Sequence, residues 1–113
     1  MTDTAARTTE RHVPADLPDH IQHYIGGEFV DSVDGATFDV LDPVSNETYL
    51  TAAAGKKADI DRAVNAARVA FTEGPWPRML PRERSRILHR IADIVESRDA
   101  RLAELESFDS GLP

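Results

Sequence analysis

A chain of 113 residues has room for one domain at most. Its formal net charge of −7 disfavours non-specific binding to nucleic acid or to an anionic membrane surface. The absence of cysteine excludes disulfides, thiolate metal sites and a cysteine nucleophile within these residues, and no apolar run reaches the length of a membrane span. Together with an N-terminus that has no apolar signal core, these properties predict a soluble cytoplasmic protein.

The first half of the chain has the signals of a small β element. Residues 1–19 are polar and without periodicity, which predicts a flexible N-terminal tail. The first structured piece is expected at residues 20–30, where Gly26 and Gly27 separate two short apolar runs. Two glycines in this position are typical of a tight β-hairpin, because glycine readily adopts positive φ.

Two further strands are expected at residues 37–42 and 48–53, with a turn at residues 43–46 between them. Asn46 suits the left-handed position of such a turn, and Asp42 supplies a local side-chain acceptor. The first half therefore predicts an antiparallel β element with too few large apolar residues to be stable alone.

A first amphipathic helix is expected at residues 58–73, where apolar residues recur at helical spacing. Asp59 and Asp61 lie in its first turn, where the helix dipole favours negative charge. Gly74 and the following proline end the helix. Trp76 then lies between two prolines and is expected to fill an apolar gap.

Residues 81–113 predict one long amphipathic helix, or two helices with a break at residues 97–99. Pro81 suits the first helical position, and Gly111 suits the left-handed residue just past the end. Most of the apolar residues share one face, at steps of three and four: Ile87, Leu88, Ile91, Ile94, Val95, Leu102, Leu105 and Phe108. A face this apolar must pack on another element.

Few side chains suggest chemistry. His20 and His23 have the spacing of half a metal site, but no third His or Cys ligand is near, and we interpret them as polar residues at the start of a strand. Arg82, Arg86 and Arg90 form a row that predicts a solvated face or a subunit contact rather than a phosphate site. Residues and spacing alone reveal no catalytic constellation.

The order of the pieces is more informative than any one of them. Three stretches follow one another in the order in which similar motifs occur at the start of the NAD(P)-dependent aldehyde dehydrogenase superfamily. They are residues 24–30, residues 38–47, and Leu-Glu-Ser-Phe-Asp-Ser-Gly-Leu-Pro at residues 105–113. Residues 20–113 resemble that superfamily in unbroken order. Asp42, Asn46 and Leu112 depart from the usual Asn, Gly and Lys of its motifs.

This resemblance implies an α/β fold for the complete protein and an α+β arrangement within the segment at hand. An N-terminal antiparallel β-hairpin element and amphipathic helices, at residues 20–113, would form part of the dinucleotide-binding domain. It implies the N-terminal part of a longer enzyme that oxidises a small aldehyde with NAD or NADP and assembles as a dimer or tetramer. The catalytic and cofactor-binding residues would lie outside this chain. The alternative is a free-standing module that docks on a partner through the helix face at residues 87–108.

The resemblance implies one site within the chain. A monovalent cation would be held by the main-chain carbonyls of Val40 and Leu41 and by the carboxylate of Asp109. Hard cations take such oxygen ligands, and a cation would offset the negative charge of Asp109 near a helix C-terminus. A solvated Asp109 is an equal alternative.

The C-terminal Gly-Leu-Pro, together with the turn at residues 42–47, resembles the branch of the superfamily that oxidises hydroxymuconic semialdehydes in aromatic-acid breakdown. This resemblance implies a semialdehyde as the substrate of the complete enzyme.

Overall fold

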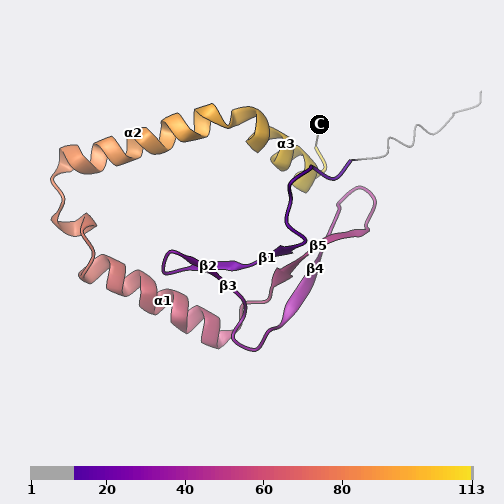
Figure 1. Cartoon of the computed structure of the whole chain (residues 1–113), viewed down its shortest axis with the longest axis horizontal. Helices are drawn as coiled ribbons and strands as arrows, with labels where there is room; N and C mark the ends of the chain where they lie inside the picture. The colour runs from indigo at the N-terminus through magenta and orange to yellow at the C-terminus, as the bar shows by residue number, and fades with distance from the viewer. Residues whose placement is uncertain (1–11, 113) are drawn as a thin grey trace, which may run out of the picture.

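The computed structural model describes residues 12–112, which form two small sheets and a chain of helices that curves back towards them (Figure 1). This is the hairpin-plus-helices arrangement that the sequence predicts. The elements in chain order are β1 (His20–Ile21), β2 (His23–Ile25), β3 (Glu28–Val30), β4 (Thr37–Leu41), β5 (Thr48–Ala53), α1 (Lys57–Thr72), the 3-10 turn η1 (Trp76–Arg78), α2 (Pro81–Ser97) and α3 (Asp99–Ser110).

The predicted hairpin is confirmed as the antiparallel pair β2–β3, which forms a two-stranded sheet. Gly26 and Gly27 make its turn with φ of 66° and 90°, a conformation that a side chain would disfavour. Tyr24 lies directly opposite Phe29, and their ring centroids are 5.0 Å apart. The cross-strand aromatic pair and the two-glycine turn together set the register of the hairpin.

The second sheet has the strand order β1-β5-β4. Strands β4 and β5 are antiparallel, and the turn between them contains Asn46 in the left-handed region with φ of 59°, as predicted. Asp42 is buried and accepts hydrogen bonds from the Val44 N–H at 3.1 Å and the Ser45 hydroxyl at 2.9 Å. The sequence did not predict β1, which pairs with β5 in parallel, because two residues are too few to show a period.

Helix α1 is fixed at its start by Asp59, which is only 3% exposed. Its carboxylate accepts the Lys56 N–H at 2.9 Å, which satisfies a backbone donor at the helix start. It also accepts the Val33 N–H at 2.8 Å, which ties α1 to the loop after β3. One carboxylate therefore orients the helix against the β element, a role beyond the dipole contact that the sequence predicts.

We expect the stability of the chain to fall at acid pH through Asp59. Hydrogen bonds from the backbone N–H groups of Lys56 and Val33 hold the pKa of Asp59 below its ordinary value of 3.8. A depressed pKa in the folded state contributes stability that is complete above the ordinary value and is lost as the pH falls through the lowered one. Urea unfolding measured from pH 6 downwards should show this loss, and Asp59→Asn should lower stability near neutral pH and reduce the acid dependence. The matched control is Asp61→Asn, which removes only an exposed ion pair with Lys57 and should change stability at either pH by less than about 0.5 kcal/mol. An Asp59→Asn chain with wild-type stability at neutral pH would contradict the role.

The alanine-rich side of α1 lies against the hairpin. A Cβ on Gly26 would stand 3.9 Å from the Cβ of Ala66, so the turn and the helix are close neighbours. A groove of about 610 Å³ runs between them, lined by Tyr24, Ile25, Gly26, Gly27, Ala63, Ala66, Ala67, Val69 and Ala70. Small side chains on this side of α1 allow the close approach.

The long C-terminal segment is two helices, and the break falls at Arg98, inside the predicted interval. Pro81 is the first residue of α2, and Gly111 follows α3 with φ of 72°, both as predicted. The expectation for Trp76 is wrong within the described chain, because this side chain is 40% exposed and fills no closed gap. Among residues 12–112, the buried apolar residues are Pro14, Leu50, Ala53 and Phe108.

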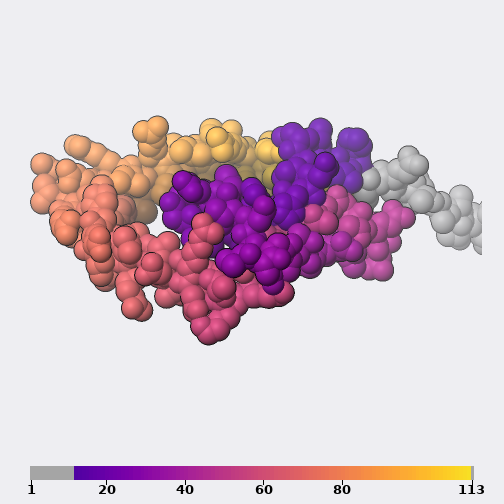
Figure 2. All heavy atoms as spheres, turned by 60° about the horizontal axis from the view of Figure 1, so that its bottom comes forward, coloured from indigo at the N-terminus to yellow at the C-terminus, as the bar shows by residue number. Residues whose placement is uncertain are grey.

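The N-terminal end of the described chain lies beside α3, as the indigo and yellow surfaces in Figure 2 show. The Arg101 guanidinium donates to the Ala15 carbonyl at 2.9 Å and to the Asp16 carboxylate at 2.6 Å. Residues 1–11 of the predicted tail lie outside the described residues, and the mobility of the tail stays a prediction. Within residues 12–112, no helix has both the length and the apolarity needed to cross a membrane.

Candidate functional site

The candidate site is organised by an irregularity between β4 and β5. Val40 pairs with Leu50, whereas Leu41 pairs with Thr48, so Tyr49 has no partner on β4. An extra residue of this kind twists a strand and redirects its side chain. Here the bulge lies at Tyr49, whose side chain reaches Asp109 of α3.

Tyr49 meets two consecutive residues of α3. Its ring lies edge-on to the ring of the buried Phe108, with centroids 5.0 Å apart. Its hydroxyl donates a hydrogen bond to the Asp109 carboxylate at 3.2 Å. Burial, followed by the nearby negative charge of Asp109, raises the pKa of the Tyr49 hydroxyl above its ordinary value of 10.0, so the hydroxyl stays protonated and donates at neutral pH.

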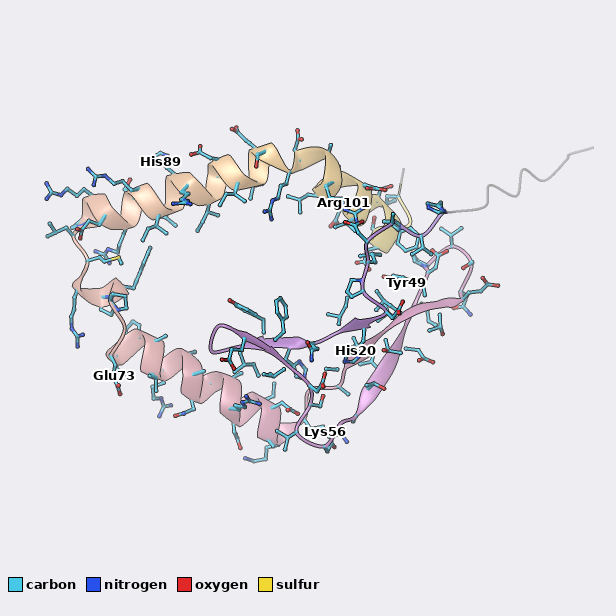
Figure 3. All side chains as sticks on the ribbon, viewed as in Figure 1. His20, Tyr49, Lys56, Glu73, His89 and Arg101 are labelled. Atoms are coloured by element: carbon cyan, nitrogen blue, oxygen red, sulfur yellow. The ribbon has the colours of Figure 1, made fainter. Side chains whose placement is uncertain are left out.

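A shallow groove of about 300 Å³ lies at this contact. Its lining is apolar except at one edge, where carboxylates from α3 and the Tyr49 hydroxyl meet. The lining residues are Leu17, Ile21, Tyr49, Leu50, Leu102, Leu105, Glu106, Phe108 and Asp109. The three labelled side chains nearest this region, His20, Tyr49 and Arg101, come from three different elements in Figure 3.

The structure places the residues predicted to hold a cation on β4 and α3, which are linked through Tyr49 of β5, and the site itself stays a prediction. Val40 and Leu41 are the last two residues of β4, and Asp109 is in the last turn of α3. Tyr49 bridges the two elements, since it lies between the partners of Val40 and Leu41 and bonds to Asp109. Main-chain carbonyls and a carboxylate are the oxygen donors that hard monovalent and divalent cations prefer, so the donor set fits.

The turn before β5 closes against the end of α3. A Cβ on Gly111 would come within 3.2 Å of the Pro43 Cγ and 3.4 Å of a Val44 methyl group. Gly111 is therefore required both by its positive φ and by the close approach of this turn. The contact holds the residue that follows α3 against the turn between β4 and β5.

The two predicted histidines are occupied by other contacts. His20 Nδ1 is 2.9 Å from the Thr51 hydroxyl, and its Nε2 is 3.2 Å from the Asp31 carboxylate. His23 Nε2 is 3.3 Å from the Ser32 hydroxyl, which donates to the Ala54 carbonyl. In the part of the chain that the structure describes, no three His, Cys, Asp or Glu side chains are grouped as metal ligands. These contacts fasten the hairpin to the larger sheet.

Sequence reasoning missed Tyr49, the residue that connects the site. Its sequence signal was weak, because aromatic residues are common in strands, and a single one in a short strand does not indicate a functional site. The row of Arg82, Arg86 and Arg90 lies on an exposed side of α2, and its role as a solvated face or a subunit contact stays a prediction.

Comparison with known proteins matches this architecture to one family. The sequence profile described as "Aldehyde dehydrogenase family" matches residues 29–113, which is most of the chain. The chain belongs to the aldehyde dehydrogenase family. Aldehyde dehydrogenase family 2 member B4, mitochondrial, of Arabidopsis thaliana is 53% identical over 94 residues, which are 83% of this chain and 18% of the relative. Benzaldehyde dehydrogenase, mitochondrial, of Antirrhinum majus is 52% identical over 89 residues, 79% of this chain and 17% of the relative.

Solved aldehyde dehydrogenase structures contain the same arrangement of elements. The NAD-dependent enzyme of Sinorhizobium meliloti superposes with a TM-score of 0.74 at 38% identity, over 81% of this chain and 18% of that chain. The NAD+ complex of a Bacillus cereus aldehyde dehydrogenase superposes with a TM-score of 0.75 at 38% identity, over 80% of this chain and 18% of that chain. The chain thus spans less than a fifth of the length of these dehydrogenases, and the alternative of a free-standing interaction module is not favoured.

Proposed function

We propose that this chain is the N-terminal, non-catalytic segment of an NAD(P)-dependent aldehyde dehydrogenase that oxidises a small aldehyde to the carboxylic acid. The observation that carries the proposal is the agreement of sequence and of fold over the same residues, at 38% identity and a TM-score of 0.75 against a dehydrogenase solved with NAD+. Bound NAD or NADP would accept the hydride in the complete enzyme. The part that we propose for residues 12–112 is structural, since they contain no cysteine to act as a nucleophile.

The substrate that we propose is a hydroxymuconic semialdehyde from aromatic-acid breakdown, in a cytoplasmic homo-oligomer of two or four subunits. Support for this finer assignment comes from the Gly-Leu-Pro at residues 111–113 and the turn at residues 42–47, which resemble that branch of the family. The complete gene product should be purified and its NAD and NADP reduction followed with a hydroxymuconic semialdehyde, benzaldehyde and acetaldehyde. The highest kcat/KM is expected with the semialdehyde. If kcat/KM with benzaldehyde and with acetaldehyde equals or exceeds the value with the semialdehyde, the proposed substrate is wrong. If neither NAD nor NADP is reduced with any of the three aldehydes, the proposed enzyme activity is wrong.

We further propose that Val40, Leu41 and Asp109 hold a monovalent cation in the complete enzyme, so that β4 and α3 are joined through it. A ligand that binds only the folded state raises the melting temperature. Sodium or potassium chloride should therefore raise it by roughly 2–4 °C over choline chloride at equal ionic strength. This difference should vanish in Asp109→Ala and persist in Glu106→Ala, whose carboxylate lines the same groove. An unchanged salt response in Asp109→Ala would count against the site.

A further inference from the structure

The Tyr49 hydroxyl occupies one oxygen of the Asp109 carboxylate. It donates a hydrogen bond to Asp109 Oδ1 at 3.2 Å. Within residues 12–112, the other oxygen, Oδ2, accepts no hydrogen bond and forms no ion pair. A free carboxylate offers both of its oxygens to a metal ion, whereas a carboxylate with one oxygen in a hydrogen bond offers the other. Asp109 is therefore held as a donor of a single oxygen.

The Tyr49 hydroxyl is held in place by the packing of its ring. The ring lies edge-on to the buried Phe108, and the neighbouring residue on β5, Leu50, is also buried. An aromatic ring packed in this way has little freedom, so the hydroxyl at its tip is a rigid donor. Asp109 itself is an exposed residue in the last turn of α3. The orientation of its carboxylate is therefore set by Tyr49 and not by its own burial.

Two further carboxylates lie near this contact. Asp42 is buried and accepts hydrogen bonds from backbone N–H groups of its own turn and from the Ser45 hydroxyl at 2.9 Å, so it serves the turn. Glu106 lies one helical turn before Asp109 and lines the same groove. Its carboxylate forms no hydrogen bond or ion pair with the rest of the described chain. A second charged donor therefore stands beside Asp109, and the oxygen that Tyr49 holds would add a third charged oxygen if it were released.

The number of charged oxygens in a site decides which cation it prefers. Calcium takes about six to eight oxygen ligands, and its affinity depends on how many of them are charged. A site made of main-chain carbonyls and a single carboxylate oxygen carries less negative charge and suits a monovalent ion. Resting on the cation site proposed above, we infer that Tyr49 is a positioning residue that sets the specificity of this site: it holds Asp109 to one oxygen ligand and thereby favours sodium or potassium over calcium.

A purely structural role for the same hydrogen bond has a different consequence. If Tyr49 only ties β5 to α3, its hydroxyl contributes the same stability in every salt. If it positions Asp109 for a cation, its removal changes the response to calcium and the response to sodium by different factors, because the released oxygen adds charge to the site. The ratio of the two cation responses therefore separates the two roles.

The test is thermal unfolding of the complete gene product, titrated with sodium chloride or calcium chloride, with choline chloride keeping the ionic strength constant. In the wild-type enzyme, half of the stabilisation should be reached at a sodium concentration no higher than that of calcium. Tyr49→Phe keeps the ring against Phe108 and removes the hydroxyl. It should lower the ratio of the calcium to the sodium midpoint at least ~5-fold. The matched control is Tyr24→Phe, which removes the hydroxyl of an exposed tyrosine in the hairpin and should change the ratio less than ~2-fold.

An unchanged ratio in Tyr49→Phe would overturn the inference, and so would a wild-type enzyme that calcium stabilises at a lower concentration than sodium, or that neither salt stabilises beyond choline chloride. If Tyr49→Phe does not fold, Tyr49→Leu also removes the hydroxyl and should give the same lowered ratio. Failure of both variants to fold would show a structural role and would likewise overturn the inference. A sodium response without aldehyde oxidation would instead reject the proposed dehydrogenase function alone, whereas oxidation without a sodium response would reject this inference alone.

Discussion

Replacing Phe108 by alanine is expected to open the α3 end of the molecule. Phe108 is 6% exposed, and its ring packs edge-on against Tyr49, so the change removes a buried aromatic side chain and leaves a cavity. The free energy for local opening of α3 should fall by about 3–4 kcal/mol, the usual cost of such a truncation. Hydrogen exchange followed by mass spectrometry should show the amides of α3 exchanging roughly 100-fold faster or more.

Phe71→Ala is the matched control, because the same side chain is 74% exposed on α1. In the isolated chain this change should alter exchange in α3 by less than about 0.5 kcal/mol, the usual range for a surface position. Wild-type exchange in Phe108→Ala would mean that the contact between β5 and α3 does not hold this end closed.

Ile91→Asp is expected to have a large effect in the complete enzyme and almost none in the isolated chain. Ile91 is 52% exposed in this chain, so a carboxylate there stays hydrated. In the complete enzyme we expect the apolar face of α2 to be covered by the rest of the polypeptide, and an unpaired buried charge there costs at least ~3 kcal/mol. The melting temperature of the complete enzyme should fall. In the isolated chain, the free energy of unfolding followed by circular dichroism should stay within about 0.5 kcal/mol of wild type.

His89→Asp, on the side of α2 that faces away from α1 and the strands, controls for the introduction of a negative charge into this helix. It should leave both proteins near wild-type stability. Equal melting temperatures for Ile91→Asp and His89→Asp in the complete enzyme would show that the apolar face of α2 remains exposed to water there.

Features that depend on neighbouring residues were predictable from the sequence. The hairpin turn at Gly26 and Gly27, the left-handed Asn46, and the helix end at Gly111 all have the expected conformations, because each follows from the φ that these residue types tolerate. The division of the last helix at Arg98 was also expected, since the apolar period is interrupted there. The order of these local pieces was enough to indicate the family.

Features that join distant parts of the chain required the tertiary structure. The bulge that turns Tyr49 towards Asp109, the bond from Val33 to Asp59 and the parallel pairing of β1 each link residues more than 25 positions apart. No local period or propensity encodes such contacts, because they arise only when separate elements pack. The amphipathic pattern likewise identified which side of α2 is apolar, but not that it stays uncovered within residues 12–112. Burial depends on what lies opposite a helix, and only three-dimensional packing decides that.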